Sequence, residues 1–424
     1  MTAISHPISL RESGVVVIGA GVAWLAAASV LRGGGVPVTV LEAAGRIGGR
    51  AWTTRPGLLG GAVFDHGATW LHAAGRNPLV ALARPEDGLL DADAVRTTRL
   101  FVAGRPATDG ERAAYARAWD GLDAVVAPAL AGPDVSLAEA MRPMAADPWA
   151  GLVALWEGAI IAAADADVLS VQDWRRNALE GPNLLPAAGV GAFIAARLGG
   201  PVCLDTSAAL VRWDRAGGVA VETAAGTVRA GAVVVTVSTG VLAAGGVRFA
   251  PRLPDAVLAA VHGLPMGLLT KIGLPGGADR LGLEDNATLV QQDGRMAFNA
   301  WPQGRGHITG FAGGRAAWQV AEDAGAAEAL ARAELRRMLG GAVDRALGAG
   351  AVVTAWGTDP LHRGAYAYAL PGQAGQRGVL AAAFPGERLL FAGEACRMDG
   401  LAGTVGGAFL SGQDAARRLL HGAM

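Results

Sequence analysis

The first candidate for chemistry in this 424-residue chain is a glycine turn that is followed by an acid. Gly19 and Gly21 come directly after the apolar run 15–18, and Glu42 ends a second apolar run, 36–41. Glycines at such a turn let the backbone approach a pyrophosphate at a helix N-terminus, and an acid after the next strand can bind a ribose hydroxyl. The spacing therefore predicts a dinucleotide site.

This glycine pattern is incomplete, because its third glycine would fall where the chain has Trp24. That glycine normally permits close packing of the helix on the strand. We therefore expect the indole to push the helix away or to turn outward, and we expect Trp24→Gly to improve cofactor affinity. Residues 14–31 carry no charge, which is also typical of a membrane span. The glycines after the strand and the alanine-rich helix argue against that alternative.

Two arginines extend the predicted dinucleotide site. Residues 45–50 read GRIGGR, so Arg46, Gly49 and Arg50 follow directly after Glu42. Guanidinium groups offer forked donors to phosphate oxygens, and the glycines permit close approach.

A single lysine is the next candidate. Of 36 lysines and arginines only Lys271 is a lysine, which indicates a place where a compact amine is needed and a guanidinium does not serve. Chance is the alternative explanation.

Composition narrows the classes of partner. The net charge is −1, which gives no basis for expecting nucleic acid or an acidic membrane. The two cysteines, Cys203 and Cys396, form no CxxC pair, so we expect neither a disulfide framework nor a metal site. No secretory signal is visible at the N-terminus, and a cytoplasmic location is the expectation.

The hydrophobic pattern predicts an α/β fold with a Rossmann-like dinucleotide domain assembled from separated segments. Its strands are expected at 15–18, 36–41, 233–237 and 388–393, with helices up to residue 31 and over 404–420. Residues 81–148 read as mostly helical, and 268–274 begins a β-rich part of an inserted α+β substrate domain. The predicted boundaries are 1–80, 201–262 and 385–424 for the dinucleotide domain, and 81–200 and 263–384 for the substrate domain.

Seven blocks in order resemble the flavin-dependent amine oxidases, the family of monoamine oxidases, polyamine oxidases and histone lysine demethylases. Beyond the glycine turn these blocks include GRIGGRAWT (45–53), DHGATWLH (65–72), FAPRLP (249–254), WGTDPLHRGAYAY (356–368), FAGEA (391–395) and GTVGGAFLSG (403–412). The motif style is most similar to that of the polyamine oxidases. The resemblance implies FAD as the cofactor and an amine and O2 as the small-molecule partners.

The same resemblance implies which residues surround the FAD. Glu42 would bind the adenosine ribose, Arg46 and Arg50 the pyrophosphate, and the backbone at Val211 the adenine. The remaining implied cofactor residues are Gly19, Gly21, Gly49, Gly67, Ala68, Thr69, Trp70, Gly393, Glu394, Thr404 and Val405. Lys271 would hold a water beside flavin N5, and Trp356 would pack near the ring.

Three further residues are expected at the substrate. Tyr366 or Tyr368 would wall the substrate site, with ordinary strand residues as the alternative. His72 would face the substrate, although a lone histidine in a loop is often only hydrogen-bonded.

Two departures from the monoamine oxidases refine the expectation. The block HRGAYAY lacks the cysteine that anchors flavin in those enzymes, so we expect non-covalent FAD. Thr404 stands where they carry a second pocket tyrosine. The implied reaction is hydride transfer from a polyamine or primary amine to flavin N5, giving an imine, an aldehyde and hydrogen peroxide.

Two other functions stay open. An L-amino-acid oxidase would need an arginine clamp, for which Arg105, Arg295 and Arg315 are candidates. A flavin-poor binding or scaffold relative is the third possibility, prompted by Trp24.

Overall fold

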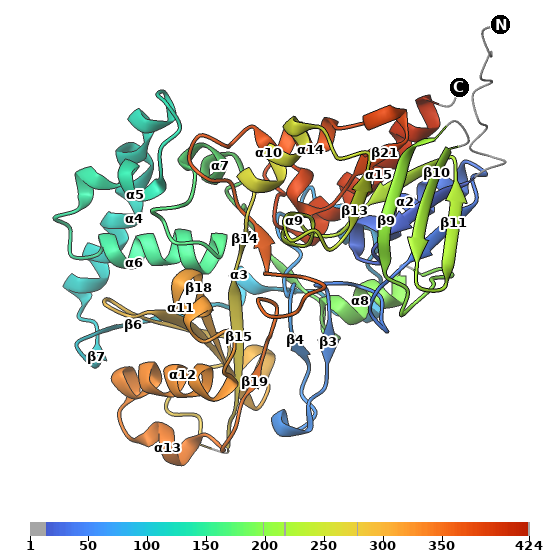
Figure 1. Ribbon diagram of the computed structural model, residues 1–424. Helices are drawn as coiled ribbons and strands as arrows, with labels where there is room; N and C mark the ends of the chain where they lie inside the picture. The colour runs from blue at the N-terminus through green and yellow to red at the C-terminus, as the bar shows by residue number, and fades with distance from the viewer. Residues whose placement is uncertain (1–13, 198, 216–217, 278, 423–424) are drawn as a thin grey trace, which may run out of the picture.

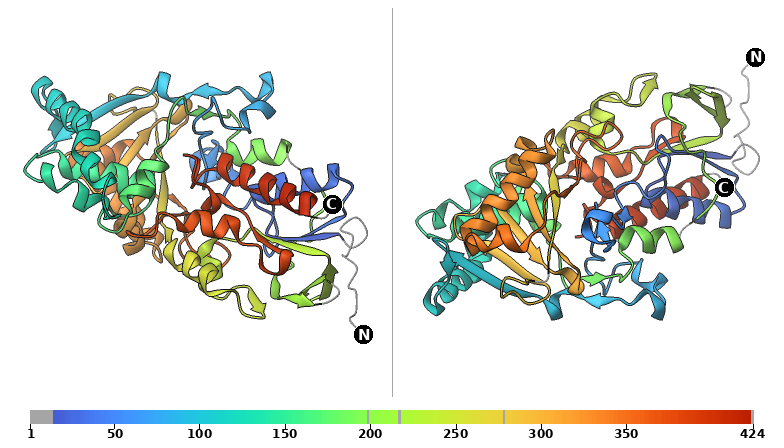
Figure 2. Two further views of the ribbon diagram at one scale, coloured as in Figure 1. Left: turned by 90° about the horizontal axis from the view of Figure 1, so that it is seen from above. Right: turned by 90° about the horizontal axis from the view of Figure 1, so that it is seen from below.

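The computed structural model describes residues 14–197, 199–215, 218–277 and 279–422. Its elements form two bodies that lie side by side (Figure 1), and the described N- and C-terminal segments lie in the same body (Figure 2). This body holds a parallel four-stranded sheet in the order β2-β1-β12-β21. The strands are β1 (Val15–Ile18), β2 (Val38–Leu41), β12 (Ala232–Val235) and β21 (Leu389–Phe391). The predicted assembly of the sheet from three separated chain segments is confirmed.

The helix α2 (Val22–Gly33) follows β1, and the C-terminal helix α15 (Val405–Gly422) packs against α2. A Cβ at Gly412 of α15 would lie only 1.9 Å from the backbone oxygen of Ala23, so a glycine is needed for the two helices to approach this closely. The helix α8 (Val190–Arg197) buries Val190 and Phe193 in the same core as β1. The sequence-derived boundary at residue 200 assigns α8 to the substrate domain, whereas its buried face packs here.

A second small sheet covers the other face of β12. Its order is β11-β10-β9-β13, and its core contains Val211, Val219 and Val233. The strands are β9 (Ala208–Arg215), β10 (Gly218–Thr223), β11 (Gly226–Ala230) and β13 (Arg248–Ala250). The adjoining helices are α9 (Thr239–Ala243), α10 (Asp255–Gly263) and α14 (Gln376–Ala382).

The other body is built on a seven-stranded mixed sheet in the order β19-β15-β18-β17-β16-β6-β7. The bounds are β6 (Thr97–Val102), β7 (Arg105–Pro106), β15 (Leu269–Pro275), β16 (Ala287–Gln291), β17 (Met296–Ala300), β18 (His307–Gly313) and β19 (Val352–Val353). The strand predicted at 268–274 is confirmed. The mostly helical interpretation of 81–148 missed β6 and β7. Both strands are short, and β6 pairs with β7 on one side and with β16, a strand far along the chain, on the other.

Helices cover both faces of this sheet. On one face lie α11 (Gly314–Gln319), α12 (Ala324–Leu339) and α13 (Ala342–Ala346), of which α12 and α13 are seen at the lower edge of Figure 1. On the other face lie α4 (Asp109–Leu130), α5 (Leu137–Ala140), α6 (Ala150–Ala154), the π-helix η5 (Leu155–Ala162) and α7 (Val171–Arg176). Ser170 caps α7 by accepting from the backbone N–H of Asp173 at 3.0 Å.

Three short strand pairs lie between the two bodies. They are β3 (Thr53–Thr54) with β4 (Phe64–Asp65), β5 (Leu90–Asp91) with β8 (Leu184–Leu185), and β14 (Met266–Gly267) with β20 (Tyr366–Ala367). The helix α3 (Ala92–Val95) follows β5 directly. In the described part of the chain, we find no helix with the length and apolar character that crossing a bilayer requires.

Candidate active site

One large cavity of about 950 Å³ runs from the glycine turn to the seven-stranded sheet. Every site residue predicted from the sequence lines it except Val211. Val211 lies inside β9, where it pairs with Val221 on one side and Phe249 on the other. The structure therefore does not bring Val211 to the cavity, and Ser207 and Ala208 at the start of β9 line it instead.

The dinucleotide end of the cavity is formed by the turn between β1 and α2. Gly19 has φ +100°, and a Cβ there would lie 2.7 Å from Thr236 Oγ1. Gly21 caps α2 and lines the cavity, and a Cβ on it would meet no other atom within 4 Å, so it would occupy the cavity itself. The Glu42 carboxylate accepts from the backbone N–H groups of Ala20 at 2.5 Å and Ala44 at 2.8 Å. An open glycine cradle, a helix N-terminus and an acid together fit a dinucleotide such as FAD.

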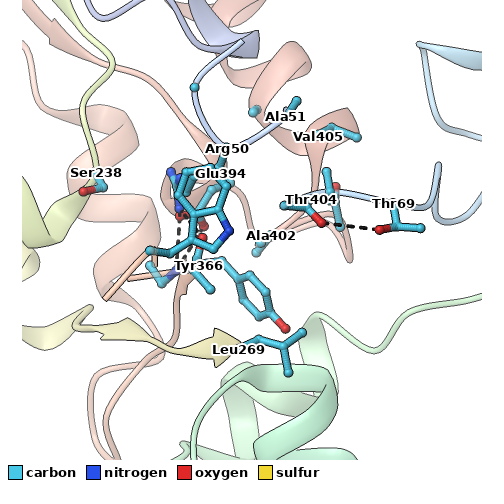
Figure 3. A pocket seen from close by; sticks show the side chains of 18 of the residues that line it. Arg50, Ala51, Thr69, Ser238, Leu269, Tyr366, Glu394, Ala402, Thr404 and Val405 are labelled. Carbon is cyan, nitrogen blue, oxygen red and sulfur yellow. Dashed lines mark hydrogen bonds and ion pairs between the residues drawn. The ribbon is translucent and has the colours of Figure 1, made fainter. Parts of the chain in front are cut away.

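Two arginines lie beside this cradle. Arg46 donates to the backbone oxygen of Gly49 at 2.7 Å and stacks on the Trp52 ring with its Cζ 4.5 Å from the centroid. Arg50 donates to Glu394 at 2.9 Å and to the backbone oxygen of Ala365 at 2.6 Å. Burial lowers the pKa of Arg46, since a charged group loses hydration there. Figure 3 shows Arg50 and Glu394 together at one side of the cavity.

Trp24 does not turn outward, contrary to the sequence-based expectation. Its side chain is 0% exposed and packs in the core of the β1 body. It does not line the cavity, so the dinucleotide cradle stays open beside it. Among the described residues, nothing accepts a hydrogen bond from its buried Nε1.

Lys271 lies at the centre of β15 and points its ammonium group at the segment after β4. The Nζ atom donates to the backbone oxygen of Asp65 at 3.1 Å and also contacts the Gly67 oxygen and Thr69 Oγ1. The Trp70 and Phe311 rings lie 5.6 and 6.0 Å from it. Burial lowers the pKa of Lys271 to about 8, because desolvation outweighs the attraction of the Asp65 carboxylate.

Aromatic rings form the wall next to Lys271. Trp356 donates to the backbone oxygen of His66 at 2.8 Å and packs edge-on against His362 at 4.8 Å. His66 stacks on Trp52 at 4.0 Å, and burial lowers its pKa to about 4, so its ring is neutral. This wall offers a flat apolar surface to a ring system.

The two candidate tyrosines have different surroundings. The Tyr366 hydroxyl donates to the backbone oxygen of Ile161 in η5 at 2.8 Å, and burial raises its pKa. In Figure 3 its ring projects toward Leu269. Tyr368 also lines the cavity, and its pKa is raised by burial and by Asp165 and Asp167.

The N-terminus of α15 reaches the cavity at Thr404 and Val405 (Figure 3). The Thr404 hydroxyl accepts from the backbone N–H of Gly407 at 3.0 Å and donates to the Leu401 oxygen at 2.7 Å. It therefore caps the helix, whose positive end can favour negative charge in the cavity. Gly393 and Ala68 line the cavity as well.

His72 is held by residues that the sequence interpretation missed. Its Nδ1 lies 2.8 Å from Asn183 Oδ1, and Asn183 Nδ2 donates to Asp93 Oδ2 at 2.9 Å. All three line the cavity. Because 111 and 90 residues separate Asn183 from its two partners, no local pattern could have found this chain.

The carboxyl group of Glu157, in η5, also lines the cavity. Trp174 Nε1 donates to it at 2.7 Å, and we find no ion pair to it among the described residues. Burial raises the pKa of Glu157, and the nearby Asp123 adds to this. No group of His, Cys, Asp and Glu in the described residues is arranged to hold a metal ion.

The fold and the site together define a flavin-binding oxidoreductase of the two-domain type. The chain belongs to the family of flavin-containing amine oxidoreductases, whose model matches residues 22–118 and 128–420. An Arabidopsis thaliana relative, lysine-specific histone demethylase 1 homolog 2, is 28% identical over 449 residues, covering 97% of this chain and 59% of its own length. Probable polyamine oxidase 4 of Arabidopsis thaliana is 43% identical over 74 residues, which is 17% of this chain and 14% of that protein.

The chain thus spans less than two thirds of the length of these relatives. The fold matches a solved structure of putrescine oxidase bound to putrescine, with a TM-score of 0.77 and 22% identity over 96% of this chain and 99% of that one. The predicted family and fold class are therefore confirmed.

Proposed function

We propose that this chain oxidises a C–N bond of a polyamine or primary amine with non-covalent FAD and O2. The observation that carries the proposal is the continuity of one cavity from the glycine cradle at Gly21 to the buried ammonium of Lys271. FAD held there would supply a hydride acceptor for the substrate α-carbon; water would hydrolyse the resulting imine to an aldehyde and an amine or ammonia, and O2 would take the two electrons to give H2O2.

The chain's own residues would hold the cofactor and exclude water. The cradle at Gly19 and Gly21, with Glu42 and Arg46, would hold the dinucleotide. The α15 N-terminus at Thr404 would favour negative charge near it. Trp356 and Tyr366 would line the apolar wall against which the amine lies, and such a wall favours the uncharged amine that can be oxidised.

Lys271 would present positive charge to oxygen as it is reduced. Its ammonium already contacts three oxygens of the segment 65–69, so its position is fixed without a ligand. Fixed charges in a dry site act strongly, because no solvent must reorganise.

Glu157 favours a substrate that carries a second amine. It is a cavity carboxyl without an ion pair among the described residues, and a distal ammonium group would supply one. The Asp173 carboxylate, another acid of the same region, is already paired with Arg377 at 2.8 Å and is therefore not free for substrate.

An L-amino-acid oxidase is the second candidate function, and it needs an arginine for the substrate carboxylate. Arg105 pairs with Glu111, Arg315 with Asp167, and Arg295 donates to Gln319. None of the three lines the cavity in the described structure. These three arginines therefore do not supply a clamp for a substrate carboxylate.

The test is a peroxide assay across putrescine, spermidine, benzylamine and L-amino acids, with Glu157→Gln beside the wild type. Gln keeps an acceptor for Trp174 and removes the charge. We expect turnover of the diamines to exceed that of benzylamine and to fall in the variant. Turnover of amino acids alone would contradict the proposal, and so would a protein that never takes up FAD.

A further inference from the structure

The strand β20, which carries Tyr366, has a neighbouring strand on only one of its edges. It pairs with β14, and Tyr368 directly after it donates its backbone N–H to the oxygen of Pro265 at 3.1 Å. Ala367 and Ala369, which alternate with the tyrosines, are 3% and 0% exposed. Because these residues are shielded from water, the polar backbone groups on the other edge need partners within the protein.

Charged side chains supply these partners where a third strand would otherwise lie. The backbone N–H of Ala367 donates to Glu394 at 3.1 Å, and the oxygen of Ala367 accepts from Arg377 at 2.8 Å. The backbone N–H of Ala369 donates to Asp173 at 3.2 Å. Hydrogen bonds that involve an ionised group are stronger than those between neutral groups. The second edge of the strand is therefore held by side chains of distant elements.

The guanidinium of Arg377 joins three segments of the chain. It donates to both oxygens of Asp173 at 2.8 and 2.9 Å, to Ala367 at 2.8 Å and to the backbone oxygen of Ala395 at 3.4 Å. A planar fork of five N–H groups can serve all of them at once, whereas a lysine ammonium has no such fork. A buried ion pair contributes little net stability compared with well-packed apolar residues. What this pair adds is a fixed place for the backbone of β20.

The tyrosines project from the other face of the same backbone. Side chains alternate along a strand, so Tyr366 and Tyr368 point away from the side on which Ala367 packs. Both rings line the cavity, whereas Ala367 lies in an apolar core. Directly before the strand, Arg50 donates to the backbone oxygen of Ala365 at 2.6 Å. The place of the strand thus determines where the two rings stand in the cavity.

We propose that Asp173 and Arg377 are positioning residues of the substrate wall, which act through the backbone of β20 to hold Tyr366 and Tyr368 at the amine. That the wall faces an amine rests on the proposed function, whereas the control of the two rings by the ion pair does not. The pair determines how well the substrate α-carbon is oriented. Its loss should therefore affect the reduction of FAD and not the reoxidation by O2.

The first arm of the test uses the tyrosines themselves, because the chain has only three, Tyr115, Tyr366 and Tyr368. Protein labelled with 3-fluorotyrosine gives one 19F resonance for each, assigned with the three Tyr→Phe variants. We expect Arg377→Lys, which keeps the charge and loses the fork, to shift or broaden the resonances of Tyr366 and Tyr368. The resonance of Tyr115, which packs against Trp149 at 5.3 Å, should stay in place. A spectrum that is unchanged in the variant would overturn the proposal.

The matched control is Arg197→Lys. Arg197 forms an ion pair with Asp87 that is also largely buried, and it donates to the backbone oxygen of Leu82 at 3.2 Å, so none of these contacts involves β20. The control should leave all three resonances in place, and equal shifts in it would refute the positioning role. Asp173→Asn is the second variant, since it keeps the shape of the side chain and one acceptor oxygen. Should Arg377→Lys not fold, a folded Asp173→Asn with unmoved resonances would also overturn the proposal.

The second arm is kinetic and uses stopped flow with the best amine of the panel. Arg377→Lys should lower the rate constant of FAD reduction by about ten- to a hundredfold, the cost of a misplaced reactant, and leave that of reoxidation unchanged. Destabilisation alone would lower the amplitudes of both half-reactions and not one rate constant, so equal losses in both would refute the role. If no amine reduces the protein but the resonances move as stated, the proposed function fails and the control of β20 by Asp173 and Arg377 stands.

Discussion

The ammonium nitrogen of Lys271 lies 3.1 Å from the backbone oxygen of Asp65, and the residue is only 4% exposed. The strand β15 of the seven-stranded sheet thus contacts the end of β4, which leads back to the body that holds the parallel sheet. The contact joins the two bodies at the place where we expect the cofactor and the amine to meet.

Replacing Lys271 by methionine should slow reoxidation by O2 and leave reduction by the amine little changed. The variant removes the fixed positive charge, and the loss of one such group costs about a hundredfold in rate. Stopped-flow measurements of the two half-reactions separate the effects. Arg295→Met, at an exposed residue directly before β17 of the same sheet, is the control. A wild-type reoxidation rate in Lys271→Met would contradict the role.

The pKa of Lys271 predicts how stability depends on pH. It is lowered to about 8 in the folded chain from 10.5, so between these values the unfolded chain binds more protons. The free energy of unfolding therefore rises with pH in this window, by up to about 3 kcal/mol. Other groups act oppositely, for example Cys396, whose pKa is raised to about 12 by burial. The measurement is thus the difference between wild type and Lys271→Met in urea unfolding at pH 7 to 10. A difference that does not change with pH would show that Lys271 does not titrate there.

The sequence predicted the parallel sheet and the dinucleotide end of the cavity because both depend on local signals. The glycine turn at Gly19 and the acid Glu42 are each adjacent to the strand that positions them. Val211 lies a few residues from Ala208, the residue of β9 that lines the cavity, because the register of a strand in a meander cannot be read from the sequence. Asn183 carries no local signal at all, because its role exists only through partners brought together by the fold.

Removing one partner of the buried ion pair Asp173–Arg377 should lower the free energy of unfolding strongly. Both side chains are 3% exposed, and the Asp173 carboxylate also accepts from the Ala369 backbone N–H at 3.2 Å. Arg377→Leu leaves an uncompensated buried carboxylate and should lower the free energy of unfolding by about 3 to 5 kcal/mol. Asp173→Leu combined with Arg377→Leu should cost less than this. The control is Arg175→Leu, whose ion pair with Asp123 is exposed and is worth about 1 kcal/mol at most. Denaturant unfolding of all four proteins decides, and equal costs for Arg377→Leu and Arg175→Leu would contradict the expectation.

The buried position of Trp24 predicts that Trp24→Gly harms the protein, whereas the incomplete glycine motif suggested that this change would improve cofactor affinity. The indole fills a core site at 0% exposure, so Trp24→Gly should leave a void and lower the free energy of unfolding by about 3 to 5 kcal/mol. The lost packing contacts belong to α2, the helix whose N-terminus forms part of the glycine cradle. We therefore expect no gain in FAD affinity. Trp24→Phe should cost far less, since it also removes the buried Nε1 that lacks an acceptor in the described structure. Thermal unfolding and FAD titration of the two variants test this, and tighter FAD binding by a stable Trp24→Gly protein would contradict it.

The flavin should leave the chain when the protein unfolds. The covalent link of the monoamine oxidases needs a cysteine in the block that here reads HRGAYAY, and this block contains none. Cys203 is exposed and Cys396 is buried, and neither lines the cavity. Burial raises the pKa of Cys396 to about 12, so its nucleophilic thiolate is scarce at neutral pH. Acid precipitation of the loaded protein should therefore give a colourless pellet and a supernatant with the full flavin absorbance. Cys396→Ala should behave identically. A yellow pellet that persists in Cys396→Ala would show a link through another side chain, and one that disappears in that variant would identify Cys396 as the point of attachment.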